Sequence, residues 1–177
     1  DLTSLQRDAN RILGFTAQQT LDYTQALYEK KLVTYPRTDS RYLTEDMKPL
    51  IPDLIARVTE KVGAGDYASE LACNAEAAGN NLCDSKKVSD HHAIIPTKTM
   101  CETDLAALPS GEKAVLQLIA VRLLCAAAPD HRYAEDTLVL LCGEEEFAKK
   151  LKTVLYGGWK DIWHRSYPAK EQEKEVY

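Results

Sequence analysis

The sequence predicts an α+β fold that is mainly helical and carries a small β-hairpin. Up to about residue 131, apolar residues recur at spacings of three and four, which is the period of helices with one buried face. From about residue 132 the period changes to the alternation that is typical of strands. We therefore expect a helical domain over residues 1–131 and a β segment with a charged tail over residues 132–177. With 177 residues, 45% of them apolar, the chain is long enough to bury a core.

The first two helices are expected over residues 4–13 and 17–30. Gly14 would end the first helix, and Thr16 is a suitable N-cap for the second. Such a pair resembles a helix-turn-helix, although similar pairs are common in proteins that do not bind DNA. The predicted inward faces are Leu5, Ala9, Ile12 and Leu13 in the first helix, and Ala17, Leu21, Thr24, Leu27 and Tyr28 in the second.

The middle of the chain is less regular. Residues 32–37 form a short extended segment, stiffened by Pro36. Thr44 is the expected N-cap of a helix over residues 45–62, adjusted at its two prolines and ended by the glycines at 63–65. Residues 66–90 are mixed, with a short alanine-rich helix and a loop at Gly79 to Asn81.

The clearest helix lies over residues 110–128, with Ser110 as its expected cap and Pro129 closing it. Two strands follow over residues 136–142 and 147–156, around an acidic turn at Gly143 to Glu146. Gly157 to Trp159 forms a junction after them. The predicted core face of the helix is Val115, Leu116, Ile119, Leu123 and Leu124.

Composition limits the class of protein. The net charge of −5 argues weakly against a nucleic-acid binder, but the chain also holds a local basic cluster of Lys30, Lys31, Arg37 and Arg41. The five cysteines form no CxxC pair and are odd in number, so we expect reduced thiols and no zinc site. No apolar run is long enough to cross a membrane, and we expect a cytoplasmic protein. The first residue is not Met, which suggests a fragment of a longer protein.

One short stretch carries chemistry. In an extended segment, residues two apart point to the same side, so Tyr35 and Arg37 are expected to project together. A phenol is a weak nucleophile near neutral pH because its pKa is about 10. A neighbouring guanidinium favours the phenolate and binds a phosphate oxygen, which suits covalent attack on a phosphodiester. Spacing alone nevertheless favours a plainer interpretation, a packed tyrosine beside a surface arginine.

Two motifs change this balance. Residues Val33 to Leu43, VTYPRTDSRYL, resemble the active-site segment of the type IA DNA topoisomerases, and the proline after the tyrosine is typical of topoisomerase III. Residues Asp90 to Thr97, DHHAIIPT, resemble a second motif of that family, again in its topoisomerase III form. Weaker similarities at LQRDA and LGFTA near the N-terminus and at Gly158-Trp159 extend the resemblance over most of residues 2–163.

The resemblance implies specific roles. Tyr35 would become linked to the 5′ phosphate of a broken DNA strand, Arg37 would hold the scissile phosphate, and His91 would support the phosphate or proton network. His92, Arg41 and Lys98 are weaker candidates for contacts with DNA. Asp39 and Ser40 more plausibly shape the loop, since both residue types favour turns.

The resemblance also implies parts that this chain lacks. The family's reaction uses Mg²⁺, whose ligands lie in a Toprim domain, and no such acidic cluster is visible here. The partners would be single-stranded DNA and the remaining Toprim and DNA-gate domains of the parent chain. Residues after about 132 would belong to an arch domain. The intact enzyme would cleave one strand, allow strand passage and reseal without ATP, whereas the isolated chain would be inactive.

Three other interpretations remain open. The first is a non-catalytic helix-turn-helix module that binds DNA. The second is a protein-interaction module without DNA contact. A metal hydrolase is the least favoured, because the adjacent His91 and His92 lack a carboxylate at ligand spacing. Trp159 and Trp163 are expected to pack rather than stack on bases, and His131 and His164 to be structural or exposed.

Overall fold

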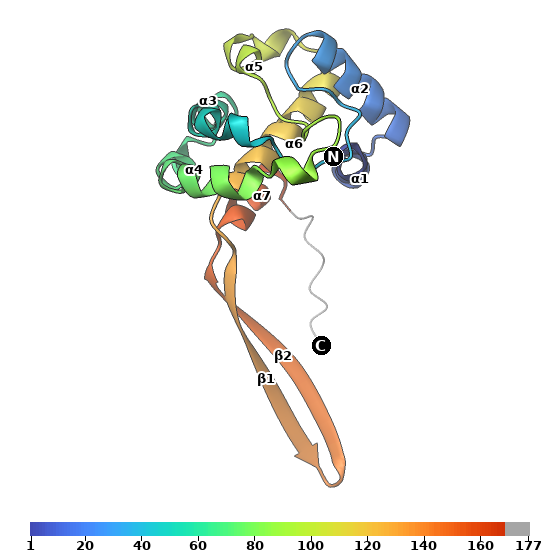
Figure 1. Cartoon of the computed structure of the whole chain (residues 1–177). Coiled ribbons are helices and arrows are strands. Elements are labelled where there is room, and N and C mark those ends of the chain that lie inside the picture. Colours follow the sequence, from blue (N-terminus) through green and yellow to red (C-terminus); the bar gives the residue numbers. More distant parts are fainter. Residues whose placement is uncertain (169–177) are drawn as a thin grey trace.

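One central helix organises the fold. Helix α6, Ser110–Ala127, runs through the helical body and is buried on most of its surface. In this computed structural model, which describes residues 1–168, the other helices surround α6 and one long hairpin projects from the body (Figure 1). Seven α-helices and one antiparallel two-stranded sheet confirm the predicted α+β, mainly helical class for the described residues.

The first two helices match their predicted positions. Helix α1, Leu2–Leu13, starts two residues early because Asp1 caps it, and it ends at Gly14, whose φ of 73° is left-handed. Thr16 caps α2, Ala17–Glu29, in a reciprocal capping box with Gln19. The predicted inward face of α2 is partly wrong, because Ala17 and Tyr28 are exposed. Its buried residues are Thr20, Thr24 and Leu27, and the last two of these belong to the predicted face.

Prolines divide the third predicted helix. A 3₁₀ helix η1, Glu45–Leu50, leads into helix α3, Ile51–Lys61, which has Pro52 in its first turn. Thr44 occupies the expected N-cap position, but its side chain makes no capping hydrogen bond. The predicted loop at Gly79 to Asn81 is wrong. These residues lie inside helix α4, Ala68–Leu82, where Gly79 is buried close to the Lys48 carbonyl.

Helix α6 contains all five predicted core residues, and each is buried. Ser110 is not its cap: the N-cap position is Pro109, and no side chain completes it. Three further 3₁₀ turns, η2 Gly65–Tyr67, η3 Ser85–Lys87 and η4 Leu105–Ala107, connect the helices.

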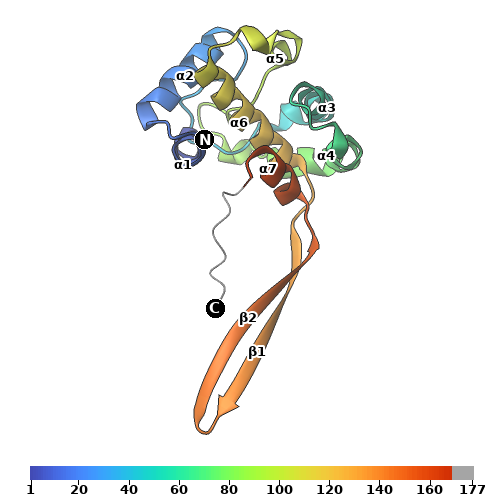
Figure 2. The same cartoon turned by 180° about the vertical axis from the view of Figure 1, so that it is seen from behind.

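The hairpin is longer than predicted. Strands β1, Arg132–Cys142, and β2, Glu145–Tyr156, pair antiparallel from Arg132↔Tyr156 to Cys142↔Glu145. Gly143, with a φ of 64°, allows the tight turn between them. Both strands are exposed along nearly their whole length, and Figure 2 shows the hairpin extending away from every helix.

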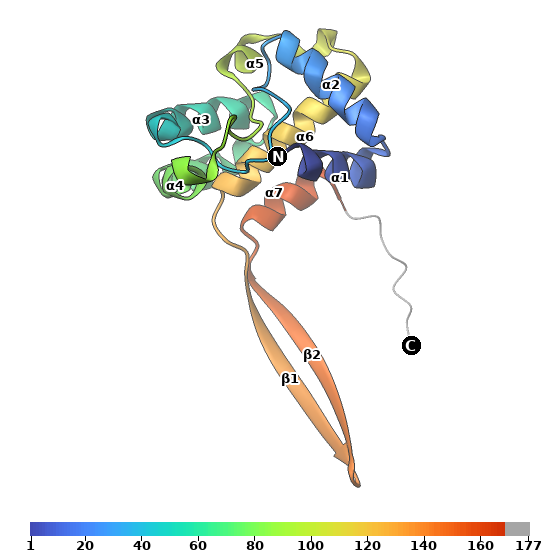
Figure 3. The same ribbon diagram turned by 45° about the vertical axis from the view of Figure 1, so that its right-hand side comes forward.

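Two short helices were not predicted. Helix α5, Lys98–Glu102, begins with a Thr97 cap, and helix α7, Trp159–Ser166, follows the hairpin and returns to α6 (Figure 3). Trp163 is buried with the Arg122 guanidinium 3.8 Å above its ring, so the predicted packing role of this tryptophan is confirmed. The charged tail from Lys170 lies outside the described residues. Within residues 1–168, no helix is long and apolar enough to cross a membrane.

Candidate active site

The two sequence motifs lie side by side, although the residues that form hydrogen bonds between them are 53 to 61 positions apart in the chain. Val33 and Pro96 form an antiparallel bridge. The Thr34 amide donates to the Ile95 carbonyl, and the Thr97 amide donates to the Leu32 carbonyl, both at 3.0 Å. This short ladder fixes the segment that carries Tyr35 against the segment that carries His91.

Two threonines on either side of Tyr35 strengthen this attachment. The Thr34 hydroxyl donates to the Ala93 carbonyl and accepts from the Ile95 amide, both at 3.0 Å. The Thr38 hydroxyl donates to the His91 carbonyl at 2.7 Å and accepts from the Ser40 amide at 3.1 Å. We call this pair the threonine clamp. The sequence does not predict this clamp, because the carbonyls that it binds lie far along the chain.

Beyond Tyr35 the loop alternates between buried and exposed residues. Pro36, Thr38 and Ser40 are buried, whereas Arg37, Asp39 and Arg41 are exposed. The Thr38 amide donates to the Pro36 carbonyl at 3.0 Å, which closes a tight turn around Arg37. Arg37 therefore faces solvent, and it forms no ion pair with any residue in the described part of the chain.

Tyr35 is half-buried between two aromatic rings. The His91 ring centroid lies 4.3 Å from that of Tyr35, at an interplanar angle of 44°. The Tyr28 ring, from the end of α2, lies 5.4 Å away and meets Tyr35 edge-on at 81°. A shallow groove next to these rings is lined by Tyr28, Glu29, Lys31, Val33, Thr34, Tyr35, His92 and Thr97. The helical period of α2 predicts Tyr28 in the core, so its place beside Tyr35 is a finding of the structure alone.

The weaker DNA-contact candidates lie in different settings. His92 lines the groove, with its Nδ1 2.9 Å from the Ala93 carbonyl oxygen. Arg41 donates to the Asp1 carboxylate and to the Ser4 hydroxyl, and Lys98 pairs with Asp53 at 3.2 Å. Hydrogen bonds from Arg57 and Lys98 hold the pKa of the Asp53 carboxyl below its usual value. Both side chains of the Lys98–Asp53 pair are about half exposed, so Lys98 can exchange its partner for a phosphate at little cost, whereas the Asp1 carboxylate that binds Arg41 is largely buried.

The loop residues behave as the turn chemistry predicted. The Ser40 hydroxyl donates to the Lys87 carbonyl at 2.9 Å and accepts from the Tyr42 amide at 3.0 Å. The Asp39 carboxylate accepts from the Ser89 hydroxyl at 3.2 Å. Both residues therefore tie the loop after Arg37 to the chain before the second motif.

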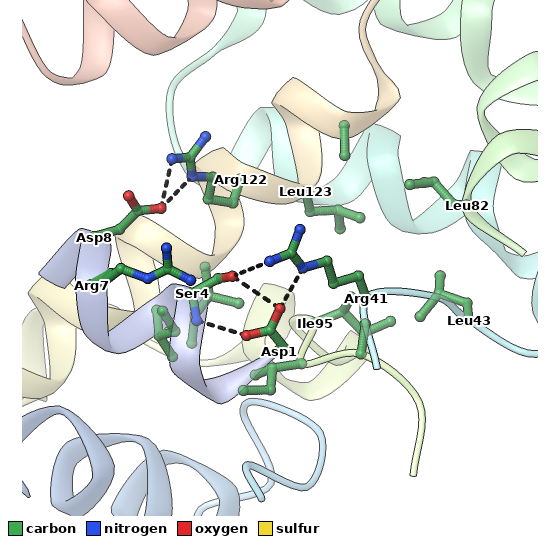
Figure 4. Close-up of a pocket in the computed structure, with 15 residues that line it drawn as sticks. Asp1, Ser4, Arg7, Asp8, Arg41, Leu43, Leu82, Ile95, Arg122 and Leu123 are labelled. Atoms are coloured by element: carbon green, nitrogen blue, oxygen red, sulfur yellow. Dashed lines mark hydrogen bonds and ion pairs between the residues drawn. The ribbon is translucent and has the colours of Figure 1, made fainter. Parts of the chain in front are cut away.

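A separate cavity of about 470 Å³ lies among α1, α6 and the second motif (Figure 4). Ala93, Ile94 and Ile95 line it, whereas His92 and Thr97, which lie on either side of this run in the chain, line the groove. Its rim holds Arg122, which donates to Asp8 at 2.9 and 2.6 Å, and Arg41 on Asp1. Both guanidinium groups are thus already paired, and the cavity holds neither Tyr35 nor Arg37.

No cluster of three or more histidine, cysteine or acidic side chains that could hold a metal ion occurs within residues 1–168. The five cysteines are free thiols at separate places in the fold. His131 lies with its Nδ1 3.0 Å from the Gly157 carbonyl at the base of the hairpin, and His164 is exposed. The predictions for these two histidines are confirmed.

A family model described as DNA topoisomerase matches residues 1–177, the whole chain. The chain belongs to the DNA topoisomerase family. The prediction of a type IA topoisomerase resembling the bacterial topoisomerase III proteins is confirmed.

Individual relatives agree with the family assignment. This topoisomerase chain is 40% identical over 176 residues to DNA topoisomerase 3 of Bacillus subtilis (strain 168), and 37% identical over 180 residues to that of Bacillus anthracis. Each match covers 99% of this chain and 24% of the relative. The structure of full-length topoisomerase I from Thermotoga maritima matches with a TM-score of 0.65 and 26% identity, over 92% of this chain and 26% of that one. The chain thus spans about a quarter of the length of the curated relatives that it matches.

Proposed function

We propose that this topoisomerase chain supplies the nucleophile that breaks one DNA strand. The single observation that supports this best is the position of Tyr35, half-buried against His91 and followed by the exposed, unpaired Arg37, on a segment that the threonine clamp holds in place. A nucleophile on a fixed segment, two residues before a free guanidinium, suits attack on a phosphodiester, because the guanidinium can bind the anionic oxygens that gain charge in the transition state.

The reaction balances without an external energy source. The Tyr35 Oη attacks the phosphorus and loses its proton, and the 3′ oxygen of the neighbouring nucleotide leaves and takes up a proton. One phosphodiester is exchanged for another, so the strand can be resealed by the reverse attack of the 3′ hydroxyl without ATP. Arg37 would hold the phosphate in both directions, and His91 would support the proton network around Tyr35.

The complete protein would supply what the described residues do not. The family uses Mg²⁺, but these residues do not form a site for it, and we place its ligands in a Toprim domain elsewhere in the complete protein. Single-stranded DNA is the proposed substrate, with Arg41, Lys98 and His92 as further contacts. We also keep the proposed division at residue 131, with the hairpin as part of an arch domain. Its many exposed apolar side chains support a further partner domain that covers them. Without these parts we expect the isolated chain to be inactive, and we propose a cytoplasmic enzyme.

The test uses the complete protein that carries this chain, with Mg²⁺ and a single-stranded oligonucleotide labelled at its 3′ end. After a denaturing quench, label should travel with the wild type and with Tyr42→Phe, a matched tyrosine from the same loop, but not with Tyr35→Phe. Arg37→Ala should slow the formation of this link by about 10²- to 10³-fold, the usual effect of removing one group that stabilises transition-state charge. If wild type and Tyr35→Phe both bind the DNA and neither is labelled, the chain is a non-catalytic DNA-binding module instead.

A further inference from the structure

An aromatic side chain with no assigned role lies next to the nucleophile. Tyr28 is 39% exposed, although the helical period of α2 predicts it in the core, and its ring meets Tyr35 edge-on at 5.4 Å. A tyrosine at a partly exposed position offers both an apolar ring and a polar hydroxyl, which suits contact with a ligand that carries both kinds of group. Here the surrounding groups are those of the groove, chiefly Lys31, Thr34 and His92.

The backbone holds Tyr28 in a fixed relation to Tyr35. The Lys31 amide donates to the Tyr28 carbonyl at 2.8 Å, and the Leu32 amide donates to the Leu27 carbonyl at 2.9 Å. Lys31 adopts a φ of 61°, a conformation that non-glycine residues rarely adopt and that turns the chain sharply from α2 into the Tyr35 segment. The Thr97 hydroxyl donates to the Lys31 carbonyl and so ties this turn to the second motif. The aromatic side of the groove is therefore preorganised in the protein without ligand.

The chemistry of the groove fits one class of ligand. Aromatic rings beside a cation are the usual way in which proteins bind the bases of single-stranded DNA, because every base can stack and the backbone is anionic. Tyr28 supplies the ring, Lys31 the cation, and His92 a ring nitrogen, Nε2, that makes no hydrogen bond within the described residues. Glu29 also lines the groove, and its carboxylate already accepts a hydrogen bond from Gln25.

We infer that the groove is a subsite for the base on the 3′ side of the break, with Tyr28 as its stacking residue. This inference rests on the proposed function: a link between Tyr35 and the 5′ phosphate tethers that nucleotide to this chain, so its base must lie within one nucleotide of Tyr35. Stacking on Tyr28 would hold the tethered end during strand passage and return it to the 3′ hydroxyl for resealing.

The test measures covalent linkage of the complete protein to 3′-labelled oligonucleotides whose cleavage position has been mapped. One oligonucleotide is intact, and another lacks the base directly 3′ of the break. Tyr28→Ala should reduce linkage to the intact oligonucleotide by about 5- to 150-fold, the range for loss of one stacked base, whereas Tyr28→Phe should retain it. Removing the base should reduce the linkage of the wild type by a similar factor. It should reduce the linkage of Tyr28→Ala only slightly further. Leu50→Ala, which removes a comparably exposed side chain outside the groove, is the matched control.

The outcomes separate this inference from the proposed function. One outcome is that the wild type forms the link while the losses of linkage caused by Tyr28→Ala and by removal of the base multiply when the two changes are combined. That result overturns the subsite and leaves Tyr28 as a residue that only packs against Tyr35. Equal linkage by Tyr28→Ala and wild type overturns it as well. Absence of linkage from wild type overturns the proposed function, and the subsite with it. Circular dichroism melts of each variant show whether any loss comes from unfolding.

Discussion

Tyr35 is positioned by residues that are not themselves chemically reactive. The threonine clamp binds the carbonyls of His91 and Ala93, and the buried Pro36 stiffens the backbone between its two members. Threonine suits this position because its branched side chain packs in an extended segment while its hydroxyl satisfies a buried carbonyl. The exposed Arg37 is free of this network, which leaves its guanidinium available for an anion.

A second residue, Tyr167, carries a buried polar group that lowers stability. Its side chain follows α7 and packs against Trp163, at a ring-centroid distance of 5.0 Å. Its hydroxyl oxygen is buried and has no hydrogen-bond partner among the described residues. Burial raises the pKa of this phenol to about 12. Leaving a hydroxyl unpaired typically costs about 1–3 kcal/mol.

We predict that Tyr167→Phe raises the free energy of unfolding at pH 7 by about 1 kcal/mol. The wild type should also lose stability as the pH rises from about 10 to about 12, because the unfolded phenol releases its proton first. The variant should lack this part of the decline. Urea unfolding followed by circular dichroism measures both effects, with the exposed Tyr133→Phe as control. A variant no more stable than wild type at pH 7 would show that the hydroxyl finds a partner.

At the scale of elements, α6 is the main source of stability. It packs against α2, α3, α4 and α7, and its buried residues lie on more than one face of the helix.

Polar contacts anchor both ends of α6. Near its C-terminal end, the buried Cys125 thiol donates to the Trp159 carbonyl at 3.5 Å, and burial raises the pKa of this thiol to about 12. The buried Glu112 in its first turn pairs with Lys30 at the end of α2, just before the Tyr35 segment. Helix α6 therefore helps to hold the segment that carries Tyr35, but it supplies no side chain to the candidate active site.

We predict that Leu124→Ala, at a fully buried position of α6, lowers the free energy of unfolding by about 2–5 kcal/mol, since the lost contacts leave a cavity. Leu50→Ala removes the same atoms from a leucine of η1 that is 48% exposed, and it should change the free energy by less than about 0.5 kcal/mol. Denaturant unfolding of the two variants makes the comparison. Equal losses would mean that α6 is not the centre of the core.

At the scale of the whole molecule, the helical body and the hairpin are nearly independent. The strands contact each other along their full register, and the hairpin meets the body mainly at its base, where the Tyr156 hydroxyl donates to Glu70 at 2.5 Å. Leu140, Leu141, Phe147 and Leu155 are among its exposed apolar residues. A two-stranded hairpin is marginally stable in isolation, so a covering partner would stabilise it.

We predict that replacing residues 132–156 with a short glycine-rich linker leaves the unfolding of the helical body unchanged within about 1 kcal/mol, the contribution of one hydrogen bond. The paired ends of the strands make this linker possible, because Arg132 and Tyr156 lie opposite each other. Thermal unfolding followed by far-ultraviolet circular dichroism, which reports the helical signal, is the measurement. Loss of cooperative unfolding in the shortened chain would show that the hairpin is part of the core.

The sequence by itself determined the class of fold, the positions of α1, α2, α6 and the hairpin, and the two motifs that identified the family. These features depend on local period, capping and short motifs, all of which can be read within a few residues. Only the tertiary structure decided that the motifs meet through the threonine clamp, that Gly79 lies inside a helix and that Tyr28 faces a groove beside Tyr35. Each of these depends on contacts between residues distant in the chain, for which local patterns hold no information.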